Sequence, residues 1–328
     1  MTAPGARGIR RVAEDALTWV TAHRARFALG EDALTADGRV DGTWKPLGEL
    51  ARVCATVIHR TGPADPLHAR AGALLEFAWR QTREGGMFSL LQRLEPFATY
   101  PLEVYAAFAS AGFRHPAYEE AAAVVARTRG WRLTEQDPTR RLGVLKAEER
   151  CGIHRPGQDP APLPRTWLGG LPEPWTFERA AGYALTHVVF HLTDWGRADD
   201  GPPQGLADYL ADWLPPWLDT CLDAGMWDLS SELLAVAATL PRPLDDVVPP
   251  DAWQRLGAVQ DPSGAIREEG HDAGDGETRD ETRDPDRYFA THYHSTLLAA
   301  FAAVLTTARP AGAPSGTGTR HGRQGAPA

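Results

Sequence analysis

The sequence predicts an all-α protein, an (α/α)6-type toroid in which an outer ring of amphipathic helices surrounds an inner ring of apolar helices. Apolar residues recur at helical spacing along most of the chain, whereas the period-two alternation between hairpin turns that strands require is absent. Segments with one polar face alternate with segments that are apolar all round; the first kind belongs outside and the second inside. This alternation, repeated along the chain, favours a closed ring of six outer–inner pairs, and an irregular helical solenoid or bundle is the alternative.

The expected helices follow from the polar and apolar faces of each segment. The first segment places Val12, Leu17 and Val20 on one face and its arginines on the other, whereas the second reads WKPLGELARVCATVIHRT and is apolar on most sides. In chain order, we expect outer helices at 10–29, 66–82, 116–129, 206–222 and 250–260, inner helices at 44–61, 101–113, 138–151, 177–196, 228–240 and 287–307, and a short helix at 88–94.

Glycine, proline and capping residues divide these helices. The glycine pair at 85–86 ends the second outer helix, and Asp228 is suited to the N-cap of an inner one. The proline pair at 215–216 should kink or split the helix at 206–222. A connection rich in proline and glycine at 156–174 is long enough to be a binding loop or lid.

The charge of the chain is concentrated in one segment. The protein has 328 residues and a net charge of −9, and residues 268–287 alone hold nine acids and three arginines. The rest is nearly neutral and shows no basic face for phosphates, so we expect no nucleic-acid partner. We expect one domain at 10–308, with disorder in its acidic insertion at 262–286, in the N-terminus at 1–9 and in the C-terminal tail at 309–328.

Several classes of protein are excluded by what the chain lacks. Its three cysteines, Cys54, Cys151 and Cys221, are far apart without CxxC spacing, which argues against a disulfide framework or a zinc knuckle. No apolar run is long enough for a membrane span, and the N-terminus lacks a signal core. We therefore expect a cytoplasmic protein, and the abundance of Ala, Gly, Pro and Arg is typical of a high-GC bacterium.

The best candidate site lies in AGYALTHVVFHLTDWG at 181–196. On a continuous helix, His187, His191 and Asp194 fall within about 60° of one another on an otherwise apolar rod. The three could bind a divalent metal such as Zn²⁺. Alternatively, His191 and Asp194 could form an imidazole–carboxylate pair for proton transfer, or all three could belong to a buried structural network.

The other inner helices carry rare polar residues of their own. Most lie in the first turns, which would gather at one mouth of a ring of parallel helices, where the helix dipoles favour negative charge. His294 is preferred over His292, because Leu298 and Phe301 extend its stripe into the core. We assign catalysis to His187, His191, Asp194 and His294, and substrate binding to Glu49, Tyr100, Glu103, Trp195 and Glu232.

Two resemblances follow from short stretches of the chain. ALTHVVFHLTDWG, TWLGGLPEPW and YHSTLLAAF, together with PLGELA and YPLEVYA, resemble an uncharacterised high-GC bacterial family, a domain of unknown function spanning 12–305. LGAVQDPSGAI, with Gln260, Asp261 and Gly264, is similar to the turn that links outer to inner helices in terpene cyclases and protein prenyltransferases. The chain lacks their DxDD and DDxxD motifs and the Cys-His motif of lanthionine cyclases, so this resemblance implies a fold and no activity.

The sequence thus favours an enzyme whose central cavity is lined by His, Asp and Glu. Its chemistry would be acid/base or metal-assisted, and its substrate an apolar or peptide-like small molecule. The alternative is a helical binding or scaffold protein without catalysis, in which the same residues close a polar network.

Overall fold

Helices make up the regular structure of this protein, as the sequence predicts. A computed structural model describes residues 3–34, 43–154, 161–270 and 284–309. Within those ranges no strand is present, and an isolated bridge between Met226 and Glu269 is the single β feature. None of the described helices combines the length and the apolar character that crossing a membrane requires.

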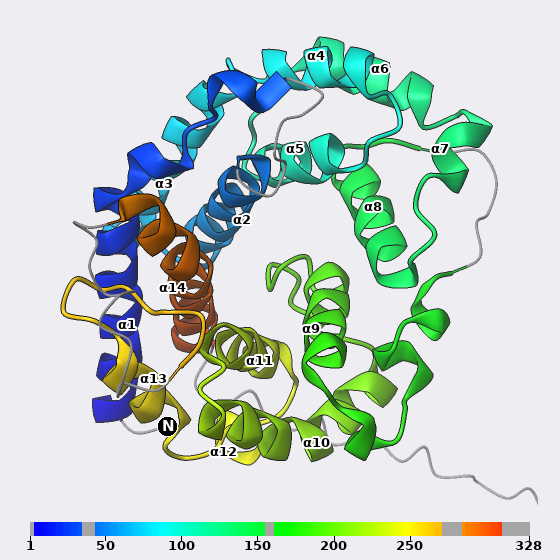
Figure 1. The fold of residues 1–328 in the computed structure, drawn as a ribbon. Helices are drawn as coiled ribbons and strands as arrows, with labels where there is room; N and C mark the ends of the chain where they lie inside the picture. Colours follow the sequence, from blue (N-terminus) through cyan, green and yellow to red (C-terminus); the bar gives the residue numbers. More distant parts are fainter. Residues whose placement is uncertain (1–2, 35–42, 155–160, 271–283, 310–328) are drawn as a thin grey trace, which may run out of the picture.

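Six helices, those that the sequence analysis assigns to the inner ring, pack against one another in a closed order. They are α2 (Trp44–Arg60), α5 (Tyr100–Ser110), α8 (Pro138–Arg150), α9 (Arg179–Leu192), α11 (Trp227–Thr239) and α14 (Pro285–Ala308). Each contacts the next in this order, and α14 contacts both α11 and α2. Figure 1 shows these helices around the middle of the molecule, with the other helices outside them.

The other helices lie outside these six (Figure 1). They are α1 (Ala3–Ala22), α3 (Pro66–Gln81), α4 (Gly86–Leu94), α6 (Pro116–Val125), α7 (Arg129–Leu133), α10 (Gln204–Asp223), α12 (Leu244–Val247) and α13 (Ala252–Val259). Burial follows the sequence pattern: every residue from Trp227 to Ala237 on the inner helix α11 is buried, whereas α3 is buried along one face. Short 3-10 helices complete the chain, η1 (Arg24–Phe27), η2 (Glu31–Leu34), η4 (Leu163–Arg165), η5 (Leu168–Gly170) and η6 (Pro174–Thr176).

Two helices differ from the sequence expectation. Helix α1 begins at Ala3, so the described part of the segment expected to be disordered is helical. Helix α10 runs unbroken through Pro215 and Pro216, because its buried face, which includes Leu214 and Trp217, stays packed while the prolines remove two backbone donors. Residues 271–283 of the acidic insertion and 310–328 of the tail lie outside the described ranges.

The turn between α13 and α14 connects the end of the chain to its beginning. Gln260 Nε2 donates to the carbonyl of Gly264 at 3.0 Å and to that of Val12 on α1 at 3.2 Å. Gly264 has a φ of +99°, and a Cβ there would lie 2.1 Å from the carbonyl oxygen of Asp15. Both the conformation and the close approach require glycine, so this turn fixes the last outer helix against the first.

Replacing Gly264 with alanine should therefore destabilise the protein. We expect Gly264→Ala to lower the free energy of unfolding by about 2 kcal/mol, because a non-glycine residue at positive φ is strained and its Cβ would push α1 away. Urea denaturation followed by circular dichroism measures this change. Gly257→Ala on α13 is the control: its Cβ would meet Val12 at an ordinary 3.7 Å, and the change should be neutral or stabilising. Equal stability of the two variants would contradict the assignment.

Candidate functional site

A cavity of about 540 Å³ lies among the inner helices α2, α5, α8 and α9. Its walls contain many of the residues assigned to the site from the sequence, together with residues that were not. The lining residues are Trp44, Lys45, Gly48, Glu49, Arg52, Thr99, Tyr100, Glu103, Val104, Thr139, Arg140, His187, His191 and Trp195. The cavity therefore brings together six of the residues assigned to the site.

The side chains reach the cavity because each helix presents one stripe to it. On α2, Lys45, Glu49 and Arg52 are spaced at i, i+4 and i+7, and on α9, His187 and His191 are spaced at i and i+4. The α5 and α8 residues come from the first two turns of their helices, and the α2 residues run from the first turn to Arg52 in the third. The N-terminal halves of three inner helices thus face one space.

Beside the cavity, His294 contacts two glutamates. His294 Nδ1 lies 2.9 Å from Glu49 Oε2, and His294 Nε2 lies 3.5 Å from Glu232 Oε1. The hydroxyl of Thr186 donates to the other oxygen of Glu232. Glu232 is only 1% exposed. These four residues, from α2, α9, α11 and α14, form what we call the carboxylate–imidazole bridge.

Both ends of the Glu49–His294 contact have shifted pKa values. Burial opposes charge on His294, but the charges of Glu49 and Glu232 and the hydrogen bonds to them outweigh it and raise the pKa of His294 well above its ordinary value. Burial likewise opposes charge on Glu49, yet the charge and hydrogen bond of His294 lower the pKa of Glu49 overall. At neutral pH the bridge therefore contains an imidazolium ion and ionised Glu49.

His187 differs from His294 although it stands next to the same glutamate. Its Nε2 lies 4.0 Å from Glu232 Oε1. Helix α9 packs between two other inner helices, but the His187 side chain is 47% exposed because its ring faces the cavity. Burial and, less strongly, the charge of Arg52 lower the pKa of His187, against the opposing effect of Glu232. His187 is thus a neutral imidazole that cavity contents can reach.

His191 lies deeper in the same wall. It is 7% exposed, and burial, with smaller effects from His187 and Arg52, lowers its pKa well below the ordinary value. The edge of the ring packs against Gly143 of α8, where a Cβ would lie 2.8 Å from its Nε2. Within the described residues, Nδ1 of His191 is buried without a hydrogen-bond partner.

Asp194 is not part of the cavity, contrary to the sequence expectation. Helix α9 ends at Leu192, and Asp194 and Trp195 adopt left-handed backbone conformations with φ of 50° and 56°. Helical spacing therefore no longer applies, and the Asp194 carboxylate accepts a hydrogen bond from Arg150 Nε. Among the residues with described positions, no three His, Cys, Asp or Glu side chains form a group that could hold a metal ion. The predicted His187, His191 and Asp194 ligands thus do not come together.

The same turn places Trp195 against the cavity, as expected, beside an arginine that the sequence did not single out. The guanidinium carbon of Arg52 lies 4.3 Å from the ring centroid of Trp195, a cation–π contact. Burial and the nearby Arg150 lower the pKa of Arg52 to about 10, which leaves it protonated at neutral pH. Its position one turn after Glu49 on α2 is the signal that could have identified it.

Tyr100 and Glu103 line the rim of the cavity on α5. The Tyr100 hydroxyl donates to Glu95 at 3.3 Å, and Glu103 Oε1 accepts from Arg140 Nη2 at 3.0 Å. Arg140 also donates through Nε to Glu135 at 3.0 Å, so its charge is paired twice. Glu103 is thus paired with a cation before any ligand binds.

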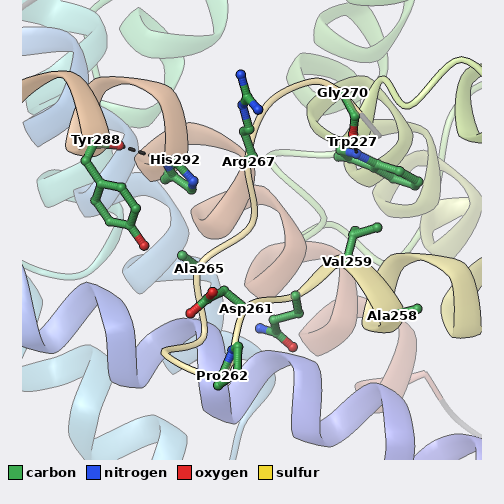
Figure 2. Close-up of a pocket in the computed structure, with 11 residues that line it drawn as sticks. Trp227, Ala258, Val259, Asp261, Pro262, Ala265, Arg267, Gly270, Tyr288 and His292 are labelled. Atoms are coloured by element: carbon green, nitrogen blue, oxygen red, sulfur yellow. Dashed lines mark hydrogen bonds between the residues drawn. The ribbon is translucent and has the colours of Figure 1, made fainter. Parts of the chain in front are cut away.

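A second cavity of about 240 Å³ lies beside the turn between α13 and α14 (Figure 2). Trp227, Arg267, Tyr288 and His292 line it. His292 Nδ1 lies 2.8 Å from the carbonyl oxygen of Tyr288, and the two rings stack at 4.2 Å. The two histidines of α14 therefore point to different places, and His294 is the one beside the cavity among α2, α5, α8 and α9.

Comparison with known proteins gives one match. A family model described as "Domain of unknown function (DUF6895)" matches residues 13–304. No curated protein and no solved structure matches the chain.

The carboxylate–imidazole bridge predicts a pH-dependent stability. His294 binds its proton more tightly in the folded state, so its contribution is complete below about pH 6.5, the value for the unfolded chain, and is lost as pH rises through the folded-state pKa. We expect His294→Gln to destabilise the protein by about 3 kcal/mol at pH 6, because it leaves buried carboxylates unpaired, and by less at alkaline pH.

Urea denaturation of both proteins between pH 6 and pH 10 measures this difference. His59→Gln is the control, since it removes an imidazole of the same helix as Glu49 that lies outside the bridge and contacts the carbonyl of Arg197. A difference between wild type and His294→Gln that grows with pH would contradict an imidazolium at this position.

Proposed function

Because the chain belongs to the DUF6895 family, a domain of unknown function, we propose its function from the geometry of the cavity. It is an enzyme in which His187 acts as a general base on a small molecule held among α2, α5, α8 and α9. We further propose that residues 10–308 form a single (α/α)6 toroid of the kind found in terpene cyclases, and that the protein works in the cytoplasm. The closed order of inner-helix contacts supports the toroid.

The observation that carries the proposal is a neutral imidazole exposed to a cavity beside a buried carboxylate. His187 has its pKa lowered below the ordinary value, so it is free to accept a proton at neutral pH. Its Nε2 faces Glu232, and its Nδ1 has no hydrogen-bond partner in the described part of the chain. We assign Nδ1 as the nitrogen that takes the proton from the substrate.

Glu232 acts on His187 rather than on the substrate. When His187 becomes an imidazolium ion, a carboxylate 4.0 Å away stabilises the new charge, and closure around a substrate would shorten this contact. Thr186 and His294 hold the two oxygens of Glu232, so its orientation is fixed. His294 and Glu49 are therefore positioning residues in this proposal.

The remaining walls suit a substrate with an apolar body. Trp44, Tyr100 and Trp195 contribute aromatic faces to the cavity. A volume of about 540 Å³ falls in the range of sites for drug-sized molecules. These features support the apolar or peptide-like small molecule expected from the sequence.

A second function has one specific observation in its favour. The carboxylate–imidazole bridge joins four inner helices through residues that are mostly buried, which is also what a structural network requires. In a binding or scaffold protein without catalysis, His187 would serve only as a polar contact for the ligand.

The two functions are distinguished by an exchange experiment in D₂O. Wild-type protein is incubated with a bacterial small-molecule extract, and mass spectrometry records compounds that gain deuterium or change mass. We expect at least one such compound, and a rate at least about 100-fold lower with His187→Ala, the usual size of a general-base contribution. The wild-type rate should rise with pH through the lowered pKa of His187 and be constant above about pH 6.5.

His59→Ala, which removes a histidine outside the cavity, is the matched control and should keep the wild-type rate. A compound turned over equally by wild type and His187→Ala would refute the assigned base. If folded wild-type protein changes no compound, the binding function is favoured instead.

A further inference from the structure

Two cations of this cavity, Arg52 and Lys45, have no carboxylate partner among the described residues; of the two, Arg52 is half-buried and Lys45 is exposed. Arg52 is half-buried on α2, and it makes a single hydrogen bond within the described residues, from Nη2 to the carbonyl oxygen of Glu103 at 3.0 Å. A guanidinium has five N–H donors. Most of the donors of Arg52 therefore have no protein acceptor.

The nearest acids, Glu49, Glu103 and Asp194, attract Arg52, but the side chain of each is bonded to another cation, which for Asp194 is Arg150. Glu49 is bonded to His294, and the side chain of Glu103 is bonded to Arg140. Arg150 also lies close enough to repel Arg52. A half-buried, unpaired charge in this setting is costly, and a bound anion would offset the cost.

The position of Arg52 is fixed before any ligand arrives. One face of its guanidinium lies over the Trp195 ring, which leaves the fork of N–H groups along the edge. Next to Trp195, the buried Nδ1 of His191 has no partner in the described chain, and His191 lines the same cavity. The Nδ1 of His191 is thus a second polar group in this wall that a ligand could hydrogen-bond.

We propose that Arg52 binds the carboxylate group of a small-molecule substrate, held in the cavity so that the rest of the molecule lies against His187. A carboxylate fits because it matches the planar fork with two parallel hydrogen bonds. The second negative charge of a phosphate dianion would be opposed by Glu49 and Glu103, which line the same cavity. This inference rests on the proposed function and adds the chemical class of its substrate.

Calorimetric titration of the full chain tests the proposal without knowledge of the substrate. The probes are benzoate, its neutral analogue benzamide and inorganic phosphate, at pH 7. We expect benzoate to bind one per chain, and benzamide and phosphate to bind at least about tenfold more weakly. Arg52→Gln should weaken benzoate binding at least about tenfold, as loss of charged hydrogen bonds implies.

Arg255→Gln on α13 is the control, since it removes a guanidinium that does not line this cavity and is bonded to Asp219 and Asp223. It should change benzoate affinity by less than about threefold, far below the loss of a charged hydrogen bond. If Arg52→Gln fails to fold, Arg52→Lys keeps the charge without the fork and should still weaken benzoate binding. Unchanged affinity in the folded Arg52 variant, or phosphate binding as tight as benzoate, would overturn the proposal.

The outcome is independent of whether His187 is a base. If wild type binds no benzoate but exchange in D₂O depends on His187, this inference fails and the proposed function stands. The converse result, with benzoate bound at Arg52 and no exchange, leaves this inference standing and refutes the proposed function.

Discussion

The structure depends on one constraint, the pairing of ionisable groups that the inner helices bury. Glu232 is almost fully buried, and an unpaired carboxylate there would cost several kcal/mol. His294 solves this problem for two helices at once, because its two ring nitrogens face Glu49 on α2 and Glu232 on α11. The packing of α14 between α2 and α11 is therefore matched by a charge contact that spans all three helices.

This pairing also divides the histidines by charge. His294 is held as an imidazolium because it touches two carboxylates, whereas His187 has one carboxylate at 4.0 Å and Arg52 opposing it, so burial decides. Two imidazoles near the same glutamate thus have pKa values shifted in opposite directions. Such a separation is what acid/base sites use to assign different roles to chemically equal groups.

Much of this arrangement could be predicted from the sequence, for a physical reason. A polar residue on an apolar inner helix must face a cavity or a partner, so Glu49, His187, His191 and His294 were found from periodicity alone. Asp194 was misplaced because the same reasoning assumes that the helix continues, and nothing in the 3.6-residue period marks its end at Leu192. Arg52 was overlooked because an arginine on a helix usually lies on the face exposed to solvent.

The end of α9 explains both errors together. Consecutive left-handed residues at Asp194 and Trp195 each cost of order 1 kcal/mol or more, so the turn persists only because its surroundings hold it. The Trp195 amide donates to the carbonyl of Phe190 at 2.6 Å, and Thr56 on α2 donates to the carbonyl of Trp195 at 3.1 Å. In a continued helix Trp195 would have no such anchor on α2. The strained turn instead places the indole ring of Trp195 against Arg52 and directs the Asp194 carboxylate to Arg150. The same backbone conformation therefore removes a predicted acid from the cavity and fixes the position of Arg52, the cation that the cavity offers to a ligand.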